Sequence, residues 1–152
     1  AEVRSAIRDL THSAAIGLNI NCFDTDGNTP LMFAASGGHA NVCMLLLQEG
    51  ARIDLRAFGD NRPLHRCFFR SRRRRWTPVH LAAWRGRSAV LRVMLAAPPE
   101  AGTTPTDLDG LLDLSGDTPL HVAVRAGHAE AAQVLAARHA AWADAANGNG
   151  QR

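Results

Sequence analysis

The side chains best suited to chemistry in this chain form one arginine run that ends in a tryptophan, Arg-Ser-Arg-Arg-Arg-Arg-Trp at residues 70–76. A guanidinium group can hold a carboxylate or a phosphate through two parallel hydrogen bonds, and a neighbouring aromatic ring can stack on a base. The same run can also be a solvated loop extended by its own repulsion, or a nuclear localisation signal. Three interpretations stay open: an acidic protein partner, a nucleic acid or nuclear-import factor, and a loop that contacts nothing.

The basic charge is concentrated around this run. Residues 52–92 hold 12 arginines and 2 acidic residues, whereas residues 1–51 hold 2 arginines and 5 acidic residues. Residues 93–152 hold 3 arginines and 7 acidic residues, so the formal net charge of the chain is only +3. All 17 basic residues are arginine, which is typical of a GC-rich genome. A basic middle between two mildly acidic ends therefore favours a partner with an acidic or polar surface.

The other reactive side chains give no catalytic or metal-binding pattern. Cys22, Cys43 and Cys67 form no C-x-x-C pair, which predicts reduced thiols inside the cell, in the cytoplasm or nucleus. No nucleophile elbow, P-loop, dinucleotide fingerprint or H-E-x-x-H motif occurs, and no apolar run reaches the ~20 residues of a membrane span. We expect no enzyme activity, no cofactor, no bound metal and no membrane segment.

Four stretches of the chain repeat one another and must form the elements that position the arginine run. They vary a T-P-L-H-x-A-A pattern and begin at Thr29, Arg62, Thr77 and Thr118. The first, third and fourth copies continue to Gly38-His39, Gly86-Arg87 and Gly127-His128. The intervals between the four starting points are 33, 15 and 41 residues, so the array is interrupted after one regular step.

This pattern resembles the ankyrin repeat, whose period is about 33 residues. The resemblance implies an all-α solenoid of stacked helix-turn-helix units with projecting turns. It also implies that the recurrent histidines, such as His80 and His121, are structural hydrogen-bonding groups rather than metal ligands. In each unit we expect the Thr to cap a helix that begins at the Pro and ends near the Gly. A second helix follows, with apolar residues spaced i, i+3 and i+4.

The predicted ankyrin-repeat domain covers residues 1–146, and a flexible tail covers residues 147–152. The domain comprises an N-terminal helix at 3–16, repeats at about 24–54, 76–97 and 113–140, and a degenerate repeat at 57–75. An alternative for this last segment is a long insertion between two repeats that happens to retain Pro-Leu-His. Residues 97–105 contain three prolines and indicate eight extra residues in a surface loop.

The resemblance also indicates where a partner would bind. In ankyrin proteins the turn tips and the residues after the Ala-Ala pair usually contact it, and Trp and Arg dominate interface hot spots. The predicted site residues are Phe58, Arg70, Arg72, Arg73, Arg74, Arg75, Trp76, Trp84, Arg85 and Arg125. We expect a monomeric protein-protein interaction scaffold that uses its turn tips and the concave face of the first helices. The alternatives are a nucleic-acid-binding or nuclear-import element at 70–75, and a structural spacer within a larger protein.

Overall fold

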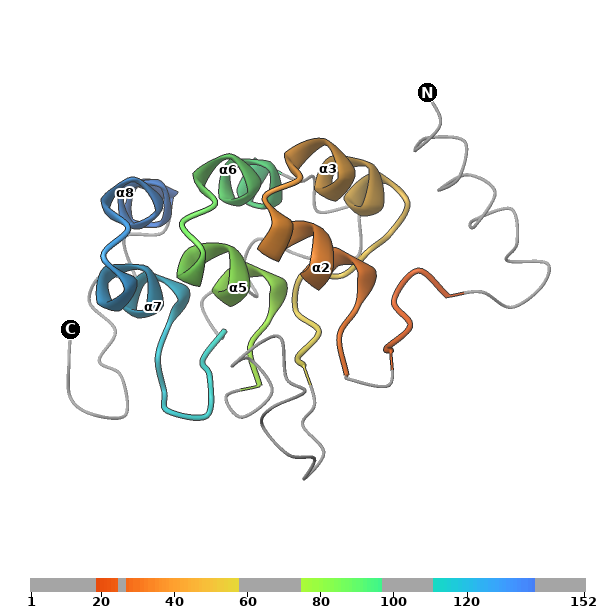
Figure 1. The fold of residues 1–152 in the computed structure, drawn as a ribbon, viewed down its shortest axis with the longest axis horizontal. Coiled ribbons are helices and arrows are strands. Elements are labelled where there is room, and N and C mark those ends of the chain that lie inside the picture. Colours follow the sequence, from red (N-terminus) through yellow and green to blue (C-terminus); the bar gives the residue numbers. More distant parts are fainter. Residues whose placement is uncertain (1–18, 25–26, 58–74, 97–110, 139–152) are drawn as a thin grey trace.

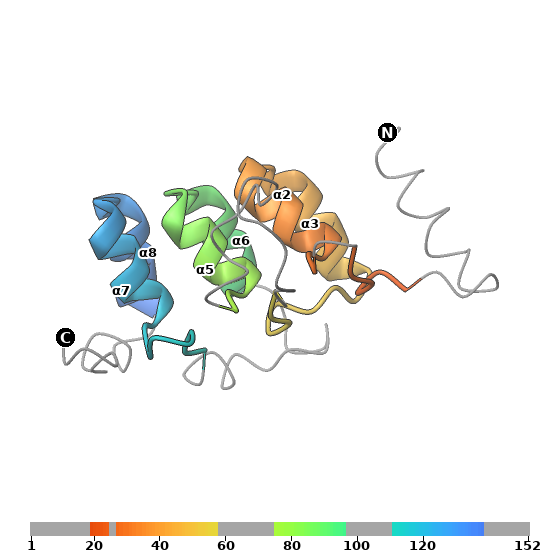
Figure 2. The ribbon, with the colours of Figure 1, turned by 60° about the horizontal axis from the view of Figure 1, so that its bottom comes forward.

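Three helix pairs stack side by side in the computed structural model, which describes residues 19–24, 27–57, 75–96 and 111–138. The pairs are α2 (Pro30–Gly37) with α3 (Ala40–Gln48), α5 (Pro78–Trp84) with α6 (Ser88–Ala96), and α7 (Pro119–Ala126) with α8 (Ala129–Arg138). The first helices α2, α5 and α7 contact one another in one row, and α3, α6 and α8 form the second row (Figure 1). A view turned by 60° shows the pairs as successive layers along the long axis (Figure 2). The predicted all-α solenoid is confirmed.

The first helix of each pair begins at the predicted threonine and proline. Thr29, Thr77 and Thr118 each accept a hydrogen bond from the backbone N–H three residues later, and the side chain of that later residue accepts from the threonine N–H. That partner is His80 in α5 and His121 in α7, where a capping box usually has Glu or Gln. The proline at the first helical position lacks an N–H that would have no helical partner there.

Small side chains let the first helices pack closely. Ala35 of α2 and Ala83 of α5 are fully buried, and Leu31 and Val79 are buried with them in the same core. Since a single helix pair has no second surface to cover these residues, burial requires the neighbouring pair. No helix among the described residues is long and apolar enough to cross a lipid bilayer.

In the middle and last units, the residue after the Gly joins its unit to the preceding one. Arg87 donates a hydrogen bond from Nε to the Ser36 carbonyl (3.2 Å), and the ring Nε2 of His128 lies 3.0 Å from the Trp84 carbonyl. Ser36 and Trp84 occupy the same repeat position. A β-carbon on Gly86 would lie 2.6 Å from the His128 ring, and Gly86 has a φ of +67°. Gly86 therefore serves both the left-handed turn and the approach of the next unit.

The break in the repeat spacing lies within one turn. We call the 18 residues between Ala57 and Trp76, residues 58–75, the excursion. In the first unit the Asp24 N–H donates to the Asn28 carbonyl (2.9 Å), and in the last the Asp113 N–H donates to the Asp117 carbonyl (3.0 Å). In the middle unit the Ala57 N–H donates to the Trp76 carbonyl (2.9 Å). The same turn-closing bond thus spans three residues in two units and 18 residues in the middle one.

Direct packing of α2 on α5, and of α3 on α6, makes the first and second pairs immediate neighbours. The interval from Thr29 to Thr77 is 48 residues, 15 more than one period of 33. These facts favour the insertion alternative over a degenerate repeat between the two pairs. Four predicted segments lie outside the described residues: residues 58–74 of the degenerate repeat, the N-terminal helix at 3–16, the loop at 97–105 and the tail at 147–152.

Replacing Gly86 by Ala should lower the free energy of unfolding at least twice as much as replacing Gly127 by Ala. Both glycines have positive φ, so each substitution costs about 1 kcal/mol of backbone strain. Only Gly86→Ala also drives a methyl group into the His128 ring, because a β-carbon on Gly127 would meet no atom within 4 Å. Urea unfolding followed by circular dichroism measures both changes. Equal losses would show that the His128 ring moves aside without cost.

Replacing residues 58–75 by Leu-Ser-Gly, the turn of the last unit, should leave the stack intact. The Ala57 and Trp76 backbones already close a turn of the required geometry. Shortening the loop about sixfold should stabilise the fold by up to about 1.5 kcal/mol through loop-closure entropy. Thermal unfolding of the two chains tests this. A loss of helical signal would show that the excursion contributes to the stack.

Candidate functional site

The structure describes five of the predicted site residues. They are Arg75, Trp76, Trp84, Arg85 and Arg125. Phe58, Arg70, Arg72, Arg73 and Arg74 lie outside the described residues. All five described residues lie at a turn or on the first helices α5 and α7, but they differ in burial and therefore in what they can do.

Trp76 lies in the core, which corrects its prediction as a surface contact. Its side chain is 2% exposed, and its indole Nε1 donates to Oδ2 of Asp113 at 3.0 Å. Its ring stacks on His80 with centroids 6.5 Å apart, and the Trp84 ring is tilted against it at 5.5 Å. The position that ends each turn is buried in all three units, and in the middle unit the indole takes this place.

Asp113 is the organising residue that the sequence analysis did not single out. Its Oδ1 accepts from the backbone N–H of Ser115 (2.7 Å) and of Asp117 (2.9 Å), while Oδ2 accepts the Trp76 indole N–H. One buried carboxylate thus shapes its own turn and holds the preceding unit's tryptophan. The sequence signal that could have identified Asp113 is Asp24, an aspartate at the same repeat position of the first unit. Asp24 likewise accepts a hydrogen bond from the Asn28 N–H (2.8 Å).

The four remaining described site residues differ in exposure and in their contacts. Arg125 is held by an ion pair with Oδ2 of Asp117 at 2.5 Å, and the Asp117 side chain is fully buried. Trp84 is half-buried against the core. Arg85, which caps the end of α5, is exposed, as is Arg75 at the end of the excursion. Arg85 and Arg75 are therefore the described guanidinium groups of the predicted site that are best placed to meet a partner, with Trp84 beside Arg85 in the chain.

Part of the basic middle is used to hold the stack together. Arg56 donates to the Leu112 carbonyl and so links the end of the first unit to the turn of the last. Arg52 forms an ion pair with Asp54 at 2.5 Å, and this hydrogen-bonded carboxylate raises the pKa of Arg52. These two of the twelve arginines of residues 52–92 therefore make intramolecular contacts.

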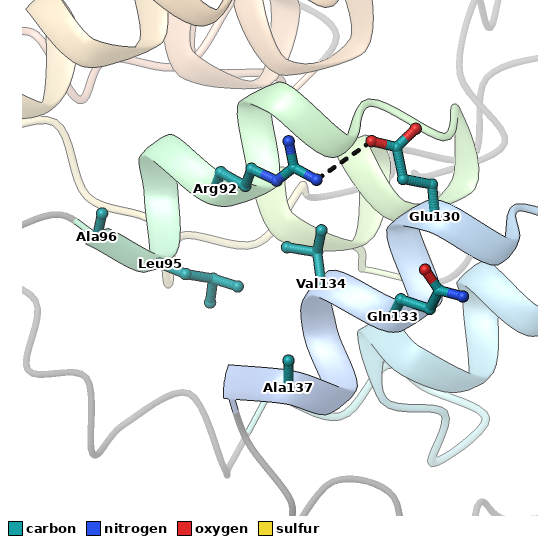
Figure 3. A pocket seen from close by; sticks show the side chains of 7 residues that line it. All are labelled: Arg92, Leu95, Ala96, Glu130, Gln133, Val134 and Ala137. Atoms are coloured by element: carbon teal, nitrogen blue, oxygen red, sulfur yellow. Dashed lines mark hydrogen bonds and ion pairs between the residues drawn. The ribbon is translucent and has the colours of Figure 1, made fainter.

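A groove of about 500 Å³ lies on the other side of the stack, between α6 and α8 (Figure 3). Its lining residues are Arg92, Leu95, Ala96, Glu130, Gln133, Val134 and Ala137. An ion pair joins Arg92 and Glu130 across it at 3.3 Å, with both side chains about two-thirds exposed. The groove offers apolar contact and one solvated ion pair, but its lining contains no nucleophile beside a base. Among the described residues no group of His, Cys, Asp and Glu could hold a metal ion.

His80 is a buried neutral imidazole. Burial lowers its pKa to about 4, outweighing a hydrogen bond to the Asp117 carbonyl and the nearby charges of Asp113 and Asp117. The carbonyl can only accept, so Nε2 carries the proton in this contact (3.2 Å) and Nδ1 accepts from the Thr77 N–H (3.3 Å). The ring thereby caps its own helix and contacts the next unit, as the resemblance implied.

Stability should fall as the pH drops from about 6.5 to about 4, because in this range an unfolded chain binds a proton at residue 80 and the folded chain does not. A shift of this size corresponds to up to about 3 kcal/mol. His80→Gln keeps a side chain that can complete the capping box and should remove this part of the pH dependence. Urea unfolding at pH 7 and pH 4.5 measures the loss. His121→Gln, at the same repeat position, is the control that should retain it. Unchanged pH dependence in His80→Gln would contradict the assignment.

Comparison with known proteins agrees with this architecture. A family model described as ankyrin repeats (3 copies) matches residues 5–100 and 68–145. Alpha-latrotoxin-Lg1a of Latrodectus geometricus is 33% identical over 109 residues, which cover 72% of this chain and 6% of the toxin. A similar toxin, alpha-latrotoxin-Lh1a of Latrodectus hasselti, is 33% identical over 71% of this chain and 6% of its own length. A probable E3 ubiquitin-protein ligase of Oryza sativa subsp. japonica is 28% identical over 71% of this chain and 30% of the ligase.

The chain thus spans between 6% and 30% of the length of these relatives. The match of the family model covers most of the chain, and the helix pairs, threonine caps and stacking contacts agree with it. This chain belongs to the ankyrin-repeat family.

Proposed function

We propose that this stack is a scaffold that binds a protein with an acidic or polar surface through its turn tips and the concave face of the first helices. Ankyrin repeats are in general protein-protein interaction modules, and the family is typically non-enzymatic. The observation that carries the finer proposal is the bond between the Ala57 N–H and the Trp76 carbonyl. This bond brings Ala57 and Trp76, the residues on either side of the excursion, together at one turn, and Arg75, the last residue of the arginine run, directly precedes Trp76.

The described surface near this turn has suitable chemistry. Arg75 and Arg85 are exposed guanidinium donors, and a guanidinium group pairs with a carboxylate through two charge-assisted hydrogen bonds. Trp84 adds a half-buried aromatic surface, and Leu114 at the tip of the last turn is 64% exposed. A partner with carboxylates around an apolar side chain would match this combination. We place the binding event inside the cell, in the cytoplasm or nucleus, with a monomeric scaffold.

The test compares partners captured by the full chain and by arginine variants. Arg72→Ala, Arg73→Ala and Arg74→Ala are combined with Arg85→Ala, and we expect at least about a tenfold rise in the Kd of a captured protein. Arg85→Ala alone is compared with Arg92→Ala as a matched pair, since each removes one exposed arginine, and Arg92→Ala on the groove side should leave the Kd unchanged. Trp76 is left intact because its loss would unfold the core. If the arginine variant bound the same partners with the same Kd as the full chain, the proposed interface would be contradicted.

Salt dependence distinguishes this proposal from nucleic-acid binding. Phosphate contacts release counterions, so the affinity of a nucleic-acid complex falls linearly with salt on logarithmic axes, with a slope near −0.7 per contact for a single strand. Titration of labelled single-stranded DNA at several salt concentrations measures that slope. Tight DNA binding that is lost in the arginine variant would show that the arginine run binds a nucleic acid rather than a protein.

A further inference from the structure

The first residue of α6, Ser88, lies among arginines. Arg85 and Arg87 precede Ser88 by three residues and by one residue, and both arginines are exposed. Ser88 itself is half-buried. The same repeat position is Ala40 in α3 and Ala129 in α8, so α6 alone among the three described second helices begins with a hydroxyl side chain.

An arginine three residues before a hydroxyl group is the feature by which many protein kinases select their substrate, because an acidic pocket of the kinase binds the guanidinium. Three hydroxyl side chains of this chain meet that condition: Thr11, Thr77 and Ser88. Thr11 lies outside the described residues. Thr77 is fully buried, and its Oγ1 lies 2.9 Å from Nδ1 of the His80 ring at the cap of α5. Ser88 is therefore the described candidate that a kinase can reach without opening the core.

Ser88 can enter the extended substrate site of a kinase through a local opening. Residues 85–89 are exposed or half-buried, and full burial begins at Val90. The loop between α5 and α6 and the first residues of α6 therefore carry no core side chain. The first backbone N–H groups of a helix have no partner within the helix, and helix ends open at low free energy. This opening leaves the packed part of α6 in place.

We propose that Ser88 is a phosphorylation site for an arginine-directed protein kinase that uses ATP. A bond forms between Ser88 Oγ and the γ-phosphorus, the bond from that phosphorus to the bridging oxygen breaks, and ADP leaves. The hydroxyl proton passes to a carboxylate base of the kinase. A phosphoserine carries a charge of about −1.5 to −2 at pH 7, which offsets the two positive charges of Arg85 and Arg87. The loop between α5 and α6 thereby changes from basic to nearly neutral.

Phosphorylation of the 152-residue chain tests the site. The chain is incubated with ATP and the catalytic subunit of cAMP-dependent protein kinase, and a peptide of residues 82–92 shows that this kinase accepts the sequence. Mass spectrometry should find phosphate at Ser88 in both, and none at Thr77 of the chain. Phosphate at Ser88 in the peptide but not in the folded chain would overturn the proposal, as would phosphate at Thr77 instead.

Variants of the chain test how the kinase selects this serine. Ser88→Ala should lose the phosphate and keep the fold, because alanine has the same position in α3 and α8. Arg85→Ala should lower kcat/KM at Ser88 at least about tenfold, since it removes a charge-assisted hydrogen bond to the kinase. Arg52→Ala removes an exposed arginine from the first unit and should leave kcat/KM unchanged. Equal values for Arg85→Ala and the parent chain would contradict the arginine-directed kinase.

The phosphate also regulates the interface proposed above, because Arg85 is one of its contacts; this part rests on the proposed function. The phosphorylated chain should bind the captured acidic protein with a Kd at least about tenfold higher, since like charges then face each other. A Kd that rises in the Arg85→Ala variant but not on phosphorylation would contradict this regulation alone. A Kd that rises in neither would contradict the proposed interface, whereas the phosphate at Ser88 is measured without any partner.

Discussion

None of the three described helix pairs can cover its own apolar surface, and the other features of the described stack depend on that constraint. Ala35 and Ala83 are fully buried only because another first helix packs on each of them. Packing at this distance requires small side chains at those positions and requires glycine at position 86, where the His128 ring occupies the space of a β-carbon. The stack is therefore stabilised by nearest-neighbour contacts, which makes each unit's stability a property of its interface.

The polar contacts across these interfaces are made by side chains to backbone carbonyls. Arg87 and His128 bind carbonyls at one repeat position, and His80 binds the carbonyl of Asp117. Such bonds satisfy buried backbone groups without requiring a particular side chain on the other unit. Two side-chain pairs among the described residues are exceptions. The exposed Arg92–Glu130 ion pair joins α6 and α8, and the buried Trp76 indole and Asp113 carboxylate join the middle turn to the last one next to the excursion. The excursion thus leaves a turn that is firmly held at its base.

The helices stabilise the stack, whereas the turn between Ala57 and Trp76 carries the excursion. A long insertion between two helices of a layer would interrupt the packing, whereas an insertion at a turn tip leaves the helix contacts unchanged. The backbone bond between Ala57 and Trp76 shows that the second arrangement is used here. Sequence in the excursion can therefore vary with the needs of binding while the stack keeps its stability, which is the usual relation between loops and the scaffold that carries them.

Local sequence determined most of the fold. Thr-Pro starts, glycine stops and the i, i+3, i+4 spacing predicted all six described helices, because caps and amphipathic faces are short-range properties. The candidate site was less predictable. Trp76 resembles an exposed hot-spot residue in sequence, yet its partners Asp113 and His80 bury it, and Asp113 is 37 residues away. Likewise, the 15-residue spacing from Arg62 to Thr77 resembles a truncated repeat, and only the bond from Ala57 to Trp76 shows that the chain leaves and rejoins the stack at one turn. Burial and register depend on contacts between distant residues, so the tertiary structure alone decided them.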